Sequence, residues 1–206
     1  LVTPDSGDFH LNGKKSDFPK PHELVDLGIA RTLQGVGLFG DLTVLENVMI
    51  GAQHLSQTGL ISAAIGRNKK DENQIRDKAR VALERVYAGG IAHRRADTLS
   101  YPDTKRVAIA RALAAKPKLI VCDEITSALD VSVQASVIET LKQLQETTKV
   151  GLLFVTHNLA LTRTIADRVA VMRKGTIVEY GGIDSVFNNP KAEYTGRLLA
   201  HTPSLK

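Results

Sequence analysis

The sequence predicts an α/β fold in which a parallel β-sheet forms the core and an α-helical subdomain is inserted into it. Apolar runs at residues 119–122 and 150–156 are typical of strands that are buried on both faces of a parallel sheet, and a helical pattern separates them. From residue 43 to residue 116, in contrast, the pattern is helical throughout. We therefore assign residues 1–42 and 117–206 to the core and residues 43–116 to the helical subdomain.

The composition fits one ordinary domain. The chain has 206 residues, 43% of them apolar, but only 4% are aromatic, so Val, Ile, Leu and Ala must build the core. The single cysteine, Cys122, cannot form an internal disulfide, which favours a reducing compartment such as the cytosol. No apolar run approaches the ~20 residues that span a bilayer, so we expect membrane association to require a partner.

The net charge of +5 does not by itself identify a partner. Lysine and arginine are scattered, and the pairs at residues 69–70 and 94–95 are each followed by acids. This pattern favours a solvated surface of mixed charge, and we expect no nucleic-acid partner.

The elements follow from local patterns, in chain order. Residues 7–13 predict a hairpin strand closed by Asn12-Gly13, and residues 28–34 predict a short strand. Thr43, with Glu46 three positions later, has the spacing of a helix capping box. Helices are predicted over residues 44–53, 67–86, 103–115, 131–147 and 159–166, and a second hairpin is predicted over residues 169–179.

Two carboxylates after the first buried strand are the strongest chemical signal. Asp123 and Glu124 come at its carboxyl end, where open α/β sheets bind ligands. Acids there are costly to desolvate unless a cation or hydrogen bonds compensate. Asp123 is placed to hold Mg²⁺, and Glu124 could polarise an attacking water as a general base. The alternative is an ordinary strand end with two solvated acids.

Two polar residues near the next elements extend this signal. His157 follows the strand at residues 150–156, so we expect it at the same sheet edge as Asp123, where it could contact a terminal phosphate. The alternative is a helix cap formed around Asn158. Asp130 closes the turn at residues 127–130, and it could be no more than the cap of the following helix.

The start of the helix predicted over residues 103–115 offers an anion site. Ser100 provides a hydroxyl beside the N–H groups and the positive dipole end of the helix, and Pro102 fits a first helical turn. A capped helix and no more would also explain these features. Gln34 ends the first short strand, where its side-chain carbonyl could reach a metal ion, although an exposed polar strand end is the alternative.

One apparent motif is misleading. Residues 12–16 superficially resemble the GxxxxGK[ST] phosphate-binding loop. However, Lys15 stands in place of the serine or threonine, Asp8 stands in place of the first glycine, and no strand–loop–helix pattern surrounds the segment. We interpret it as a turn.

Taken in order, the pieces resemble the ATP-binding-cassette (ABC) ATPases over essentially the whole chain. Gln34 matches the Q-loop, and residues 99–103 occupy the place of the LSGGQ signature. Residues 119–124 match the Walker B strand with its catalytic glutamate, residues 127–130 match the D-loop, and His157 matches the switch histidine. Five motifs in the family's order outweigh the separate alternatives.

The resemblance implies a P-loop-NTPase-like core that binds ATP and Mg²⁺ in a homo- or heterodimer with a second ABC ATPase domain. Asp123 and Gln34 would hold Mg²⁺, Glu124 would orient or activate water, and His157 would contact the γ-phosphate. Asp130 would help to couple the two sites. The signature residues that would face the ATP of the other subunit are Leu99, Ser100, Tyr101, Pro102 and Asp103.

The resemblance also implies a place in the cell. The helical region over residues 43–116 would dock transmembrane permease subunits, which would hold the protein peripherally on the cytoplasmic face of the inner membrane.

The chain departs from the family pattern in three places. The Walker A loop and the adenine-stacking aromatic residue normally precede the strand at Leu11, so we expect the fold to lack the N-terminal strand–loop–helix, roughly forty residues. The two signature glycines are Tyr101 and Pro102, and proline has no backbone N–H to offer a phosphate. Ile125 replaces the proline that usually follows Walker B.

The hints about the transported substrate conflict. Residues 28–51 are similar to ATPases of branched-chain amino-acid importers, whereas residues 126–135 and 187–199 are similar to those of oligopeptide and dipeptide importers. Two other functions stay open: a catalytically impaired or silent ABC subunit, and a non-transport ABC ATPase.

We predict that residues 1–206 alone bind Mg-ATP weakly and hydrolyse it negligibly. Phosphate binding in this family depends on backbone N–H groups and a lysine of the Walker A loop, which this stretch of sequence does not contain. Isothermal titration with Mg-ATP measures the affinity directly. A dissociation constant in the micromolar range would contradict the prediction.

Overall fold

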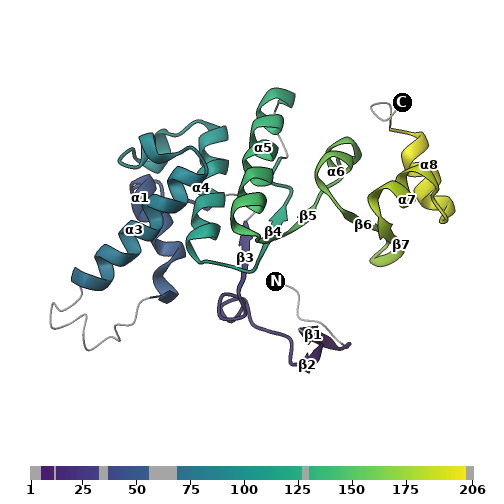
Figure 1. Cartoon of the computed structure of the whole chain (residues 1–206), viewed down its shortest axis with the longest axis horizontal. Coiled ribbons are helices and arrows are strands. Elements are labelled where there is room, and N and C mark those ends of the chain that lie inside the picture. The colour runs from purple at the N-terminus through teal and green to yellow at the C-terminus, as the bar shows by residue number, and fades with distance from the viewer. Residues whose placement is uncertain (1–5, 12, 33–36, 56–68, 127–129, 203–206) are drawn as a thin grey trace. The chain divides into compact units, whose positions relative to one another are not determined.

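The structure is a computed structural model that describes residues 6–11, 13–32, 37–55, 69–126 and 130–202. The chain forms two compact units, Leu1–Leu153 and Phe154–Lys206. Figure 1 shows their elements. The predicted boundaries of the helical subdomain, at residues 42–43 and 116–117, stay a prediction. The two compact units meet at residues 153–154, and their boundary does not test whether residues 43–116 form an inserted subdomain.

The first unit contains a three-stranded sheet in the order β3-β4-β5 (Figure 1). Its strands are β3 (Ile29–Thr32), β4 (Leu119–Asp123) and β5 (Gly151–Val155), of which residues 151–153 belong to the first unit. β3 and β4 run parallel, with Thr32 opposite Cys122. Ile120 and Cys122 have no exposed surface, as expected for a central strand that is covered on both faces. The predicted parallel sheet is therefore confirmed.

A small hairpin precedes this sheet. β1 (Phe9–Leu11) pairs antiparallel with β2 (Lys14–Ser16), which confirms the predicted hairpin. In the segment that superficially resembles a phosphate-binding loop, residues 14–16 form a strand rather than a turn, and Asn12 lies outside the described residues.

In the chain, the described residues between β3 and β4 include the helices α1 (Val44–Gly51), α3 (Lys69–Arg85) and α4 (Tyr101–Ala114), which pack together. Three short 3₁₀ turns connect them: η1 (Gln53–Leu55), η2 (Gly89–Ile91) and η3 (Ala96–Thr98). Val48, Leu83 and Ile109, one from each helix, are fully buried in their common core. α1 approaches α4 so closely that a Cβ at Gly51 would lie 2.1 Å from the carbonyl oxygen of Arg111.

The helix caps agree with the sequence, with one shift. Thr43 Oγ1 accepts from Glu46 N at 3.2 Å and Glu46 Oε2 accepts from Thr43 N at 2.7 Å, which confirms the capping box. α4 begins at Tyr101, two residues earlier than predicted, because Ser100 serves as its cap and Pro102 lies within the first turn. α5 (Val131–Thr148) follows β4 and contributes Leu141 and Leu144 to the core.

The second unit is built on a β-hairpin. α6 (Leu159–Ile165) is followed by β6 (Arg168–Arg173) and β7 (Thr176–Gly182), which pair antiparallel with an irregularity at Val171–Met172. Two helices that the sequence analysis did not predict end the unit: α7 (Ile183–Asn188) and α8 (Glu193–Ala200). Among the described residues, no helix has both the length and the apolar character that a membrane crossing requires.

Asn47 fastens the segment before α1 to that helix, and we predict that it is needed for stability. The side chain is fully buried; its Oδ1 accepts from Phe39 N at 2.8 Å, and its Nδ2 donates to the carbonyl oxygens of Phe39 and Thr43 at 3.0 and 2.9 Å. Asn47→Ala should lower the free energy of unfolding by about 2–3 kcal/mol, because part-buried backbone groups of Phe39 and Thr43 lose their hydrogen-bond partner. Denaturant titration measures the change.

Asn73→Ala is the matched control, because Asn73 lies exposed on α3. It should change the free energy of unfolding by no more than about 0.5 kcal/mol. Equal effects of the two substitutions would show that the Asn47 contacts do not stabilise the fold.

Candidate functional site

Asp123 ends β4, and a cation from the neighbouring strand meets its carboxylate. The parallel register sets Arg31 of β3 beside Val121, two residues before Asp123. Arg31 Nη2 donates to Asp123 Oδ2 at 2.6 Å, and the Asp123 side chain is 21% exposed. The acid is thus partly desolvated and compensated by a positive charge, as the sequence analysis required of a carboxylate at this position.

Glu124 follows Asp123 in an uncommon backbone conformation. Its φ of 44° lies in the left-handed region, which residues other than glycine seldom adopt. Ile125 and Thr126, directly after it, are 4% exposed and anchor the chain in the core. Backbone conformations of this kind persist only where the surroundings enforce them, and they cluster at functional sites. The backbone at Glu124 is therefore constrained by the strand before it and by the buried residues after it.

Asp130 lies at the start of α5, where it acts as the helix cap. Its Oδ1 accepts from Val133 N at 2.9 Å. In the second turn of the same helix, Gln134 Nε2 donates to the carbonyl oxygen of Thr126 at 3.2 Å and so ties the turn to the helix. The local capping role is confirmed, whereas the coupling role of Asp130 stays a prediction. Residues 127–129 lie outside the described residues.

Ser100 caps α4 through a reciprocal contact with Asp103. Its Oγ accepts from Asp103 N at 3.3 Å and donates to Asp103 Oδ2 at 2.7 Å. Leu99, before the cap, is half-buried, and Pro102 lies in the first turn. The segment predicted to face a phosphate is thus an ordered helix N-terminus, a kind of structure that favours anions.

Tyr101, in place of the first signature glycine, packs against its own helix. The Lys105 ammonium lies 5.0 Å from the centre of the Tyr101 ring, a cation–π distance. Lys105 is 1% exposed and Tyr101 is 45% exposed. The tyrosine therefore leaves one side of its ring at the surface while it covers the lysine.

His157 belongs to the second unit. Its side chain is exposed, and the following residue caps α6, with Asn158 Oδ1 accepting from Leu161 N at 3.0 Å. The capping role considered for Asn158 is confirmed. Asp123 and Glu124 belong to the first unit, so the expectation that they and His157 meet at one sheet edge stays a prediction.

The described residues fit a magnesium ion that arrives with a nucleotide. Within them, no three side chains of His, Cys, Asp or Glu gather as a metal cluster. Mg²⁺ commonly takes only one or two carboxylates and completes its shell with water and phosphate oxygens, so Asp123 alone suits it. Gln34, the other predicted ligand, lies outside the described residues. Burial raises the pKa of the Cys122 thiol to about 12. The thiol is therefore a poor nucleophile, because the thiolate is the reactive form.

The sequence analysis missed a surface pocket beside α1. It has a volume of about 310 Å³ and is largely apolar. Its lining residues are Leu42, Glu46, Met49, Ile50, Gln53 and Ile75. Ile50 is 39% exposed, and a large apolar residue on the outer side of a capped helix is the signal that could have indicated a contact surface.

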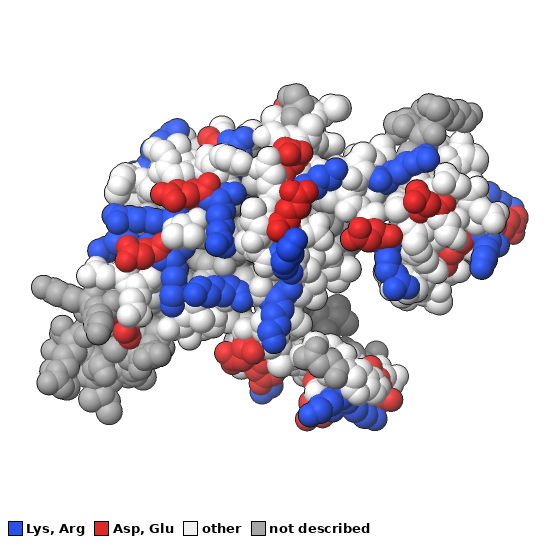
Figure 2. All heavy atoms as spheres, viewed as in Figure 1, with Lys and Arg blue, Asp and Glu red and all other residues white. Residues whose placement is uncertain are grey.

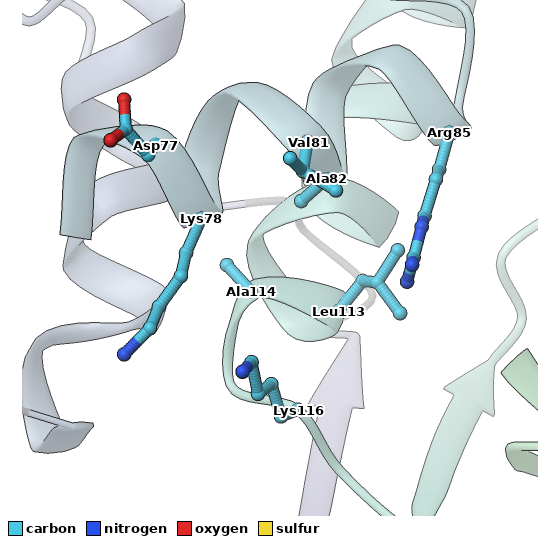
Figure 3. Close-up of a pocket in the computed structure, with 8 residues that line it drawn as sticks. All are labelled: Asp77, Lys78, Val81, Ala82, Arg85, Leu113, Ala114 and Lys116. Atoms are coloured by element: carbon cyan, nitrogen blue, oxygen red, sulfur yellow. The ribbon is translucent and has the colours of Figure 1, made fainter. Parts of the chain in front are cut away.

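A second pocket, of about 320 Å³, lies between α3 and the end of α4 (Figure 3). Three cations line it, Lys78, Arg85 and Lys116, and Figure 3 shows the Asp77 carboxylate pointing away from them. Arg85 and Lys116 lie at the C-terminal ends of the two helices, where cations offset the helix dipole. On the face of the first unit in Figure 2, charges of both signs are interspersed. The positions of Arg85 and Lys116 are therefore explained by the stability of the two helices.

Comparison with known proteins decides the family. The sequence profile described as "ABC transporter" matches residues 1–127. The chain belongs to the ABC transporter family.

Curated ABC relatives carry oligopeptide-transport names. The oligopeptide transport ATP-binding protein OppD of Bacillus subtilis is 49% identical over 102 residues, which is 50% of this chain and 28% of OppD. OppF of Salmonella typhimurium is 40% identical over 136 residues, 66% of this chain and 41% of OppF. OppF of Mycoplasma genitalium is 45% identical over 125 residues, 61% of this chain and 14% of OppF. The chain thus spans less than half the length of these relatives.

Solved ABC structures confirm the fold class. A nucleotide-free ATP-binding cassette from an ABC transporter superposes with a TM-score of 0.76 at 26% identity, over 96% of this chain and 78% of that one. The dimeric cassette MJ0796, bound to ADP and phosphate after hydrolysis, gives a TM-score of 0.70 at 25% identity, over 88% and 75%. The α/β fold with a parallel sheet, predicted from the sequence, is that of an ABC cassette.

Proposed function

We propose that this chain is part of the ATP-binding, ATP-hydrolysing subunit of an ABC importer for oligopeptides. The observation that carries the proposal is the carboxylate pair at the end of a buried parallel strand, Asp123 held by Arg31 and Glu124 held in a left-handed conformation. Membership of the ABC transporter family supports ATP hydrolysis as the activity. The oligopeptide-transport names of the relatives favour peptides over branched-chain amino acids.

In this proposal the side chains at the end of β4 act on bound ATP. Asp123 would release Arg31 and help to hold the Mg²⁺ that accompanies the nucleotide, where the ion neutralises charge on the phosphates. Glu124 would orient a water molecule for attack and accept its proton. His157 would contact the γ-phosphate, and Gln34 would complete the metal shell.

The N-terminus of α4 would serve a second ATPase domain. Ser100 combines a hydroxyl with the positive end of a helix of 14 residues, and this combination suits the phosphate of an ATP bound by the partner. Pro102 removes one possible backbone donor from that surface. Asp130, at the start of α5, would help to couple the two sites of the dimer.

The pocket beside α1 would receive the permease. It opens on an apolar side chain, Ile50, and the segment that leads into it is tied to α1 by the buried Asn47. A mainly apolar groove flanked by a single carboxylate, Glu46, suits an amphipathic permease helix. This contact would hold the protein on the cytoplasmic face of the inner membrane.

We predict that peptide uptake by the importer containing this chain depends on Glu124. In proteoliposomes loaded with ATP, Glu124→Gln should lower the uptake of a labelled oligopeptide by about 10²- to 10⁴-fold, the range expected for loss of a general base. ATP should still bind, because the amide keeps the size and shape of the side chain. Uptake and filter binding of labelled ATP measure the two effects.

Glu139→Gln is the matched control, since Glu139 is exposed on α5 and should leave uptake unchanged. Uptake that survives Glu124→Gln would remove Glu124 from this role and favour a silent subunit. Uptake of labelled leucine in preference to the peptide would favour the branched-chain alternative.

A further inference from the structure

The Arg106 side chain joins the two helices that begin at the predicted signature and D-loop positions. It leaves α4 nearly two turns after Ser100, and its Nη1 donates to Asp103 Oδ1 at 3.4 Å. Its Nη2 donates to Ser136 Oγ of α5 at 3.1 Å. Because the side chain is only 27% exposed, these contacts are partly shielded from water. One guanidinium therefore links α4 to α5.

The Asp103 carboxylate extends this link to Ser100. Its second oxygen, Oδ2, accepts from Ser100 Oγ at 2.7 Å, while Oδ1 accepts from Arg106. The contacts form an unbroken path from Ser136 through Arg106 and Asp103 to the hydroxyl of Ser100. Ser136 of α5 is therefore connected through side-chain contacts to Ser100, the residue that caps α4.

The orientation of Arg106 leaves one donor without an acceptor. The Arg106 Nε is buried and finds no partner among the described residues. A buried unpaired donor is unfavourable, so an arginine that served only as a helix-surface charge would be expected to turn toward solvent. The two Nη contacts hold the side chain inward against this penalty.

An ordinary ion pair on a helix surface looks different. Arg80 and Asp77 of α3 have the same three-residue spacing, but their charged atoms lie 3.9 Å apart and their side chains are 55% and 74% exposed. Such an exposed pair contributes little to stability. The bridge to α5 is what distinguishes Arg106.

We propose that Arg106 is a positioning residue that couples the start of α5 to Ser100. The proposal rests on the proposed function, in which Ser100 faces the ATP of a second domain and Asp130, the cap of α5, couples the two sites. A displacement of α5 when the domains meet would reach the Ser100 hydroxyl through Arg106 and Asp103. The planar guanidinium presents one Nη group to Asp103 and the other to Ser136, whereas lysine offers a single nitrogen, so lysine should not replace arginine here.

Solvent-exchange NMR on the chain without nucleotide tests the coupling. The Asp103 amide, which donates to Ser100 Oγ, reports on the cap. Ser136→Ala removes only a hydroxyl on another helix, yet it should raise the exchange rate of this amide about fivefold, the factor that corresponds to one net hydrogen bond. Arg106→Lys should raise it similarly, and adding Ser136→Ala to that variant should raise it no further.

Arg80→Lys is the matched control, because it alters an i,i+3 pair on α3 and should leave the Asp103 amide unchanged. An Asp103 amide that exchanges at the wild-type rate in Ser136→Ala would overturn the proposal. The proposal would also be overturned if Ser136→Ala raised the exchange rate of the Asp103 amide by the same factor in the Arg106→Lys background as in the wild type. The exchange rates are measured without nucleotide, so they do not depend on ATPase or uptake activity. The proposed function and the coupling through Arg106 can therefore be contradicted independently.

Discussion

Burial of β4 beside its parallel neighbour β3 is the constraint on which the candidate site depends. Ile120 and Cys122 are fully buried, so the strand cannot slide without exposing its apolar side chains or burying its polar end. The same register that fixes β4 puts Arg31 within reach of Asp123. From this one strand pairing follow the placement of both carboxylates and the cation that compensates the first of them.

Two capped helices build outward from that strand. α4 precedes β4 and begins at Ser100, whereas α5 follows it and begins at Asp130. Both caps are short polar side chains that satisfy a first-turn amide, so the sequence specifies where each helix begins. Arg106 then joins the two helices by side-chain contacts alone. The proposed functional groups thus lie at the ends of a strand and two helices, and in our proposal a few side chains couple them.

Local patterns predicted most of the elements, because caps and buried runs depend on near neighbours in the chain. The Thr43–Glu46 capping box and the strand at residues 119–122 are examples. The ion pair between Arg31 and Asp123 joins residues 92 positions apart, and the bond from Arg106 to Ser136 spans 30, so both needed a register or a helix packing that no local pattern encodes. α7 and α8 were missed: they have 6 and 8 residues, fewer than the window of about 11–18 residues over which helical periodicity is read.

The central claim is that side chains from successive strand ends surround a triphosphate. An experimental structure of the importer that contains this chain, with Mg²⁺ and a non-hydrolysable ATP analogue, tests it most directly. The account predicts that His157 lies beside Glu124 at the terminal phosphate and that Asp123 faces the metal ion rather than Arg31. A His157 on the opposite rim of the sheet, or an analogue bound away from the end of β4, would contradict it.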